Sequence, residues 1–181
     1  NSQKARLSLI DVFNITTSIT DASVCENSNK TYTIVADQPV SFRWMKNGVD
    51  IPGATTASLV LNNIPFADNG AVYSCEVYNN CKSQIVSSTL TVSRPLSVTT
   101  QPQNGIACPL APYSINIVVS GTNPQYQWYK SPAVLLPGQT ASSLSFAAFA
   151  PADAGTYYCI VTNGCGSITS NNAVIVAGTN T

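Results

Sequence analysis

The feature that most constrains the fold of this chain is an internal duplication. Cys25 and Cys108 are 83 residues apart, and Trp44 and Trp128 are 84 residues apart. The offset drifts by only a residue or two along the whole repeat, so each copy must encode one complete folding unit. A chain of 181 residues has room for two such units of about 90 residues.

The pattern within each copy is that of an all-β protein. Short runs of alternating apolar residues are separated by Asn-Gly, Pro-Gly and Asn-Asn turn signals. In the first copy these runs predict strands over about 14–18, 31–36, 41–46, 57–62, 71–78 and 83–92. Proline after Arg94 interrupts the last of them. We therefore expect a leading segment over 1–12, a first domain over 13–94 and a second over 95–181.

One motif makes the fold class specific. In both copies an Asp-x-Gly turn is followed by Tyr-x-Cys, which resembles the corner before strand F of an immunoglobulin-like domain. A tryptophan lies earlier in each copy, where such domains bury one on strand C. The resemblance implies two tandem immunoglobulin-like β-sandwiches with these residues in their cores. They are Trp44, Tyr73 and Cys75 in the first copy and Trp128, Tyr157 and Cys159 in the second.

The sequences of several loops narrow the resemblance to one group of immunoglobulin-like proteins. Pro-Gly-Ala-Thr, Ala-Asp-Ala-Gly-Thr-Tyr and Val-Thr-Asn-Gly-Cys-Gly-Ser are similar to segments of immunoglobulin-like repeats in bacterial secreted and cell-surface proteins. Such repeats serve as spacers, adhesive stalks or accessory modules. The resemblance therefore implies a structural or binding role.

The cysteines depart from the immunoglobulin pattern. Ile34 and Ile117 occupy the strand-B position opposite the strand-F cysteine, so the usual disulfide between the sheets is excluded. We expect Cys75 and Cys159 to be inert core thiols packed beside tryptophan. Each copy has two further cysteines, one before strand B and one after strand F. These disulfide candidates are Cys25, Cys81, Cys108 and Cys165.

The pairing of these cysteines is open at the sequence level. In an undistorted immunoglobulin-like domain Cys25 would lie about 13 Å from the level of Cys75, and Cys81 further away still. A disulfide needs Cα atoms within about 7 Å. Because the A–B turn of one domain faces the F–G turn of the next in a head-to-tail tandem, a Cys25–Cys165 bridge is one hypothesis. It leaves Cys81 and Cys108 for neighbours in an array.

Charge is sparse, and this excludes two classes of partner. Charged residues make up 9% of the chain, against roughly 25% in an average globular protein. After Arg94 only Lys130 and Asp153 are charged. Such a chain cannot hold a phosphate backbone or an anionic membrane electrostatically, and it has no apolar run long enough for membrane insertion. We expect protein partners, either copies of itself or neighbouring immunoglobulin-like domains.

The sequence offers little for catalysis. It contains no histidine, and its eight carboxylates are scattered. The cysteine spacing does not match paired zinc knuckles. Tyr78 and Tyr129 are too few to argue for a carbohydrate site. We therefore expect no enzymatic activity, no metal and no cofactor.

The first twelve residues do not belong to the first copy. With the same offset, Ala5, Leu7 and Leu9 align with the end of a final strand, Ser88–Val92. They are either the remnant of an upstream domain or a strand donated to the edge of another subunit.

These patterns predict an extracellular or cell-surface module. Six cysteines favour an oxidising compartment. The first expectation is a spacer of a surface protein or a filament subunit that assembles by edge-strand pairing. The alternative is a carbohydrate-binding accessory module of a larger secreted enzyme.

Overall fold

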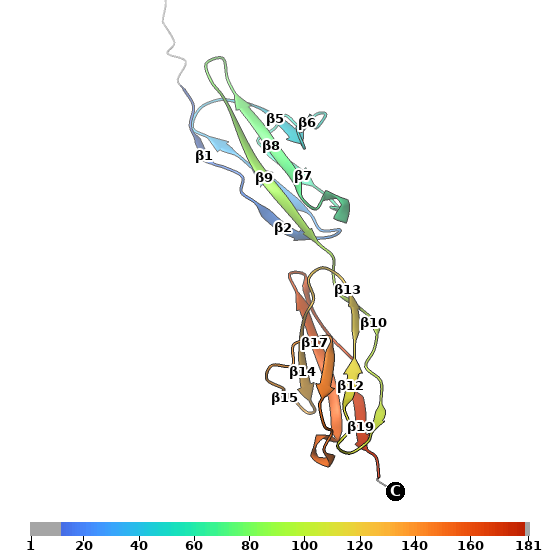
Figure 1. Cartoon of the computed structure of the whole chain (residues 1–181). Helices are drawn as coiled ribbons and strands as arrows, with labels where there is room; N and C mark the ends of the chain where they lie inside the picture. Colours follow the sequence, from blue (N-terminus) through green and yellow to red (C-terminus); the bar gives the residue numbers. More distant parts are fainter. Residues whose placement is uncertain (1–11, 180–181) are drawn as a thin grey trace, which may run out of the picture. The chain divides into compact units, whose positions relative to one another are not determined.

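The structure is a computed structural model that describes residues 12–179. The chain divides into two compact units, Asn1–Val92 and Ser93–Thr181. The division falls two residues before the boundary predicted from the sequence. Figure 1 labels most strands of the two units, and we describe each unit by itself.

The first unit is a sandwich of two layers of β-strands. Its main sheet has the order β2-β9-β8-β5-β6, and the pairs β3–β7 and β1–β4 form its other layer. A short 3₁₀ helix, η1 (Phe66–Asp68), precedes β8. The strands are β1 (Ile15–Thr17), β2 (Ala22–Cys25), β3 (Lys30–Thr33), β4 (Val35–Ala36), β5 (Ser41–Lys46), β6 (Val49–Asp50), β7 (Ser58–Leu61), β8 (Ala71–Tyr78) and β9 (Ser83–Ser93).

The second unit repeats this arrangement. Its main sheet has the order β11-β19-β17-β14-β15, with β18 paired to β17, and the other layer contains the pairs β12–β16 and β10–β13. A 3₁₀ helix, η2 (Pro151–Asp153), precedes β17. The strands are β10 (Ser97–Thr100), β11 (Gly105–Ala107), β12 (Tyr113–Asn116), β13 (Val118–Ser120), β14 (Gln125–Lys130), β15 (Val134–Leu135), β16 (Ser143–Phe146), β17 (Gly155–Asn163), β18 (Gly166–Thr169) and β19 (Ala173–Ala177).

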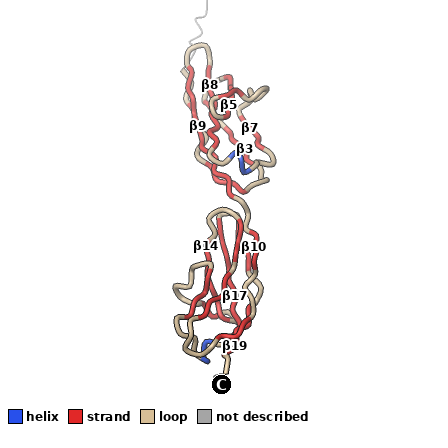
Figure 2. The backbone as a smooth tube through the Cα atoms, turned by 45° about the vertical axis from the view of Figure 1, so that its right-hand side comes forward, coloured by secondary structure: helices blue, strands red, loops and turns tan. Residues whose placement is uncertain are grey.

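Alternation along the strands builds the two cores. In β8 the buried side chains alternate with exposed or half-buried ones, because successive side chains of a strand point to opposite faces of the sheet. β17 behaves in the same way. Strands dominate both units in Figure 2. The expected fold class, all-β with two immunoglobulin-like sandwiches, is confirmed.

Most predicted strands correspond closely to those observed. The ranges 41–46 and 71–78 coincide with β5 and β8. The sequence did not predict β2 and β6. The reason is physical: β2 has only four residues with none fully buried, and β6 has two residues that are both exposed, so each carries too little apolar pattern to identify a strand.

Candidate functional site

The two tryptophans are structural. Trp44 on β5 and Trp128 on β14 both have 0% of their surface exposed. The indole N–H of Trp44 donates to the carbonyl of Thr56 at 2.9 Å, and that of Trp128 donates to the carbonyl of Ala141 at 2.9 Å. With the indole N–H satisfied inside the core, neither ring offers a face to a ligand.

The tyrosines before the strand-F cysteines hold the turn that leads into that strand. The Tyr73 hydroxyl donates to Oδ2 of Asp68 at 2.9 Å, and Lys46 forms an ion pair with Oδ1 of the same carboxylate at 2.6 Å. Burial and this hydrogen bond raise the pKa of Tyr73. In the second unit the Tyr157 hydroxyl donates to the Asp153 carbonyl instead. The carboxylate Oδ2 of Asp153 accepts from the backbone N–H of Ala150 at 2.8 Å, so both aspartates stabilise turns.

Cys75 and Cys159 are buried free thiols. Both have 0% of their surface exposed, on β8 and β17 respectively. Cys75 lies directly across from Trp44, and Cys159 directly across from Trp128. Burial raises the pKa of each thiol to about 11. Since the thiolate is the nucleophile, neither sulfur is reactive near neutral pH.

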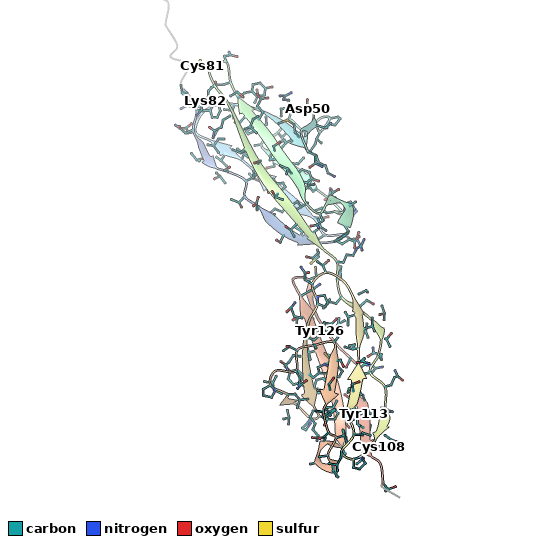
Figure 3. All side chains as sticks on the ribbon, in the orientation of Figure 1. Asp50, Cys81, Lys82, Cys108, Tyr113 and Tyr126 are labelled. Carbon is teal, nitrogen blue, oxygen red and sulfur yellow. The ribbon has the colours of Figure 1, made fainter. Side chains whose placement is uncertain are left out.

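The other four cysteines fall into two states. Cys81 and Cys108 are exposed free thiols. Cys25 and Cys165 are disulfide-bonded. Figure 3 labels Cys81 at the hairpin between β8 and β9, and Cys108 just after β11. The sequence named all four as disulfide candidates, and its hypothesis of a Cys25–Cys165 bridge divides them into the same two groups.

These states predict a specific thiol count. In native protein at neutral pH, a thiol reagent such as dithionitrobenzoate should react quickly with two thiols, Cys81 and Cys108. After unfolding in denaturant without reductant it should react with four, because Cys75 and Cys159 are then accessible. Four fast thiols in the native protein would contradict the buried state of the two core cysteines. A Cys81→Ser/Cys108→Ser variant is the control, and its native count should be close to zero.

The structure brings together no candidate metal-binding cluster within residues 12–179. No group of three or more His, Cys, Asp or Glu residues in that range is placed to hold a metal ion. Over the same range, no helix has the length and apolarity needed to cross a membrane. Ala5, Leu7 and Leu9 lie outside the described residues.

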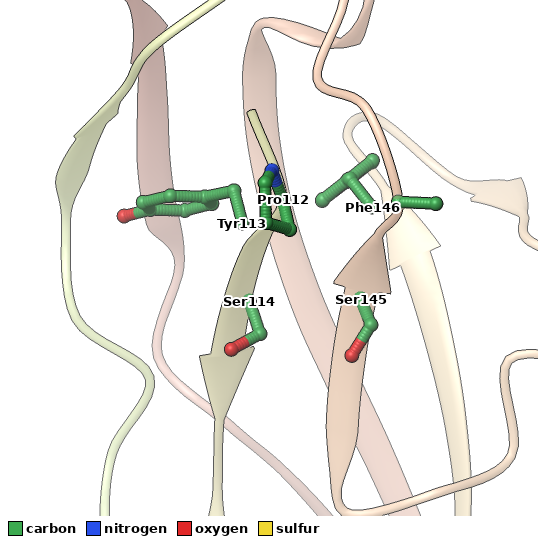
Figure 4. Close-up of a pocket in the computed structure, with 6 residues that line it drawn as sticks. Pro112, Tyr113, Ser114, Ser145 and Phe146 are labelled. Carbon is green, nitrogen blue, oxygen red and sulfur yellow. The ribbon is translucent and has the colours of Figure 1, made fainter. Parts of the chain in front are cut away.

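A shallow hollow lies on the β12–β16 layer of the second unit. Figure 4 shows its lining, which includes Tyr113, Phe146 and the hydroxyls of Ser114 and Ser145. The two serines face each other in the strand register. Neither has a nearby base among the lining residues, so the hollow has no activated nucleophile.

The outer face of the main sheet of the second unit carries aromatic and aliphatic side chains. Tyr129 on β14 and Tyr158 on β17 are cross-strand partners, and their rings stack with centroids 5.3 Å apart and planes 10° apart. On the same face, Val174 and Val176 of β19 are 44% and 46% exposed, and Ile106 of β11 is 69% exposed. We call these five residues the tyrosine face.

No described residue of the tyrosine face is charged, and the two charged side chains beyond Arg94 lie elsewhere. Lys130 donates to the carbonyl of Ala152 at 3.0 Å and lies over the ring of Tyr157, while Asp153 belongs to η2. The sequence missed Tyr158 as a surface residue. Its alternation with the inward Tyr157 and Cys159 along the strand was the available signal.

The chain is similar to known proteins that contain immunoglobulin domains. Residues 88–177 match the family described as "Immunoglobulin domain". Over 133 residues the chain is 28% identical to "Cell adhesion molecule DSCAM" of Gallus gallus. The match covers 66% of this chain and 6% of that relative. The chain therefore spans only a small part of the relative's length.

Two solved structures illustrate the fold. "Sidekick-1 immunoglobulin domains 1-4" is similar at a TM-score of 0.77 and 22% identity, covering 92% of this chain and 49% of that one. A three-domain titin fragment, I67-I69, is similar at a TM-score of 0.68 and 21% identity, covering 92% and 66%. These relatives do not support the bacterial part of the predicted resemblance. By fold, the chain is a tandem of two immunoglobulin-like domains, similar to those of cell-adhesion proteins and of titin.

Proposed function

We propose that this chain is a non-catalytic adhesion module that associates with copies of itself through the tyrosine face of its second domain. The observation that carries the proposal is the composition of that face, which combines a stacked tyrosine pair with three exposed aliphatic side chains and no charge. Aromatic enrichment and depletion of charge mark the cores of protein–protein interfaces. The similarity to a cell-adhesion molecule supports the same class of function.

The equivalent face of the first unit is built differently. There Arg43 on β5 forms ion pairs with Glu76 at 2.7 Å and with Asp50 at 3.4 Å. Hydrogen bonds to Ser83 and Arg43 lower the pKa of Glu76, so this carboxylate is ionised at neutral pH. Charged, hydrated side chains make a contact core costly. This contrast directs the proposal to the second unit.

The test is self-association measured by sedimentation velocity. A Cys81→Ser/Cys108→Ser background removes the exposed thiols, so only non-covalent association is measured. Tyr129→Ala combined with Tyr158→Ala should weaken association by more than about tenfold, since tyrosines at the centre of an interface often contribute 2 kcal/mol or more. The matched control is Val60→Ala, an exposed position on β7 of the first unit, which should leave association unchanged.

A parent chain that is monomeric at every concentration would overturn the proposed self-association. If such a chain is retained on a polysaccharide column and the double tyrosine variant is not, the stacked pair serves a carbohydrate-binding accessory module instead, because exposed aromatic rings also stack on sugars.

We further propose an extracellular location and a Cys25–Cys165 bridge. Disulfide-bonded cysteines persist in oxidising compartments, and both residues are disulfide-bonded. Peptide mapping without reductant should recover one peptide that joins Cys25 to Cys165. Recovery of Cys25 joined to Cys75 or Cys81 would contradict the bridge, and a Cys25→Ser variant is the control that should leave Cys165 as a free thiol.

The proposed donation of a strand by residues 1–12 has its own test. Deleting residues 1–12 should abolish filament formation if Ala5, Leu7 and Leu9 pair with the edge of another subunit. Filaments formed by the deletion variant would rule out that mode of assembly.

A further inference from the structure

The cysteines of the two domains are equivalent in position but opposite in state. Cys25 ends β2 and Cys108 follows β11, yet Cys25 is disulfide-bonded and Cys108 is an exposed free thiol. At the other pair of positions the states are reversed, because Cys165 is disulfide-bonded and Cys81 is an exposed free thiol. Each free thiol is therefore the repeat counterpart of a cysteine that already forms a disulfide.

The hairpin between β8 and β9 and the hairpin between β17 and β18 present their cysteines in the same way. The backbone N–H of Cys81 donates to Oδ1 of Asn79 at 2.9 Å. The backbone N–H of Cys165 donates to Oδ1 of Asn163 at 2.8 Å. In both cases the asparagine two residues earlier closes the turn with its side chain. The backbone that suits Cys165 for a disulfide is thus reproduced at Cys81.

The turn that follows β2 in the first unit is reproduced after β11 in the second unit. The carbonyl of Cys25 accepts from the N–H of Ser28 at 3.1 Å, and that of Cys108 accepts from the N–H of Ala111 at 3.2 Å. The residue before each donor has a positive φ, 64° at Asn27 and 61° at Leu110. Cys108 therefore occupies the same turn as the disulfide-bonded Cys25.

Leu110 gives the turn after β11 an unusual apolar surface. Asparagine adopts the left-handed conformation readily, but a leucine there is uncommon and strained. Leu110 is also 81% exposed. A bulky apolar side chain held in a strained conformation and in water beside a free thiol suits a contact surface. Burial of this side chain against another protein would offset its exposure.

We propose that Cys81 of one copy of this chain forms a disulfide with Cys108 of a second copy. The inference rests on the Cys25–Cys165 pairing proposed above, which joins the same two types of turn. Because Cys81 and Cys108 belong to different domains, each copy can form one bond through Cys81 and another through Cys108 with two different neighbours. Repetition of the contact links copies head to tail into open chains.

The reaction uses a small disulfide, such as oxidised glutathione, as the oxidant. The Cys81 thiolate attacks one sulfur of the oxidant, forms a mixed disulfide and releases one thiol. The Cys108 thiolate of the second copy then attacks the Cys81 sulfur and releases the second thiol. The two protein thiols lose two protons and two electrons, the electrons reduce the oxidant, and one S–S bond joins the copies.

The test incubates purified chain with a mixture of reduced and oxidised glutathione and analyses the products by non-reducing electrophoresis and light scattering. The wild-type chain should form a ladder of linked copies. Cys81→Ser alone and Cys108→Ser alone should each run as a single-chain band in non-reducing electrophoresis, carrying only a glutathione adduct. An equal mixture of the two single variants should stop at a dimer, with one peptide that joins Cys81 to Cys108.

Other outcomes overturn the inference. Dimers of either single variant would show that the free thiols link indiscriminately, and a wild-type chain that stays monomeric would show that the two turns do not meet. Both cysteines are exposed, so matching thermal melts confirm that the serine variants are folded. The Tyr129→Ala/Tyr158→Ala variant separates the proposals: unchanged non-covalent association with an intact ladder refutes the tyrosine face alone, whereas lost association with an intact ladder supports both proposals.

Discussion

Replacing Trp128 with alanine should lower the free energy of unfolding of the second domain by about 3–5 kcal/mol. The side chain has no exposed surface and lies directly across from Cys159. Its loss leaves a large cavity, and it also leaves the carbonyl of Ala141 without the indole donor. Both effects destabilise the folded state, because buried polar groups need partners and cores repack only in part.

Urea unfolding followed by circular dichroism measures this loss. Each domain contains one tryptophan, so in the Trp128→Ala variant the remaining tryptophan fluorescence comes from Trp44 alone and reports the first domain. Val134→Ala is the matched control, since Val134 is 56% exposed and should change stability by less than about 0.5 kcal/mol. A circular dichroism transition identical to that of the wild type would contradict a core role for Trp128.

Alkaline pH should destabilise both domains through Cys75 and Cys159. Burial raises the pKa of each thiol from 9.0 to about 11, so the folded state favours the protonated form. The stabilisation is fully present below about pH 9 and is lost as pH rises through about 11. At 1.36 kcal/mol per pH unit, each domain loses about 3 kcal/mol over this interval.

The melting temperature measured from about pH 8 to about pH 11 tests this loss. Cys81 and Cys108 are alkylated first, so that they do not exchange with the disulfide at high pH. The pKa values of Tyr73 and Tyr157 are also raised, and the tyrosines add to the decline in the same direction. The Cys75→Ala/Cys159→Ala variant isolates the thiols and should show a shallower decline. Equal slopes for the variant and the parent would refute the thiol contribution.

The sequence by itself determined the fold class and the contents of the two cores. The duplication, the Asp-x-Gly and Tyr-x-Cys motif and the tryptophans lie within short stretches of chain, so the strands at 41–46 and 71–78 could be read directly. Local alternation of apolar side chains encodes which face of a strand is buried. That information needs no knowledge of neighbouring strands.

Only the tertiary structure decided what the surfaces present. Tyr129 and Tyr158 stack because β14 and β17 pair in one particular register, and a register shift by one residue would send each ring to the opposite face. Cys25 and Cys108 are close repeat equivalents, yet one is disulfide-bonded and the other is free. A sulfur forms a disulfide only where another sulfur meets it in space. That meeting depends on residues far away in the sequence, so no local pattern encodes it.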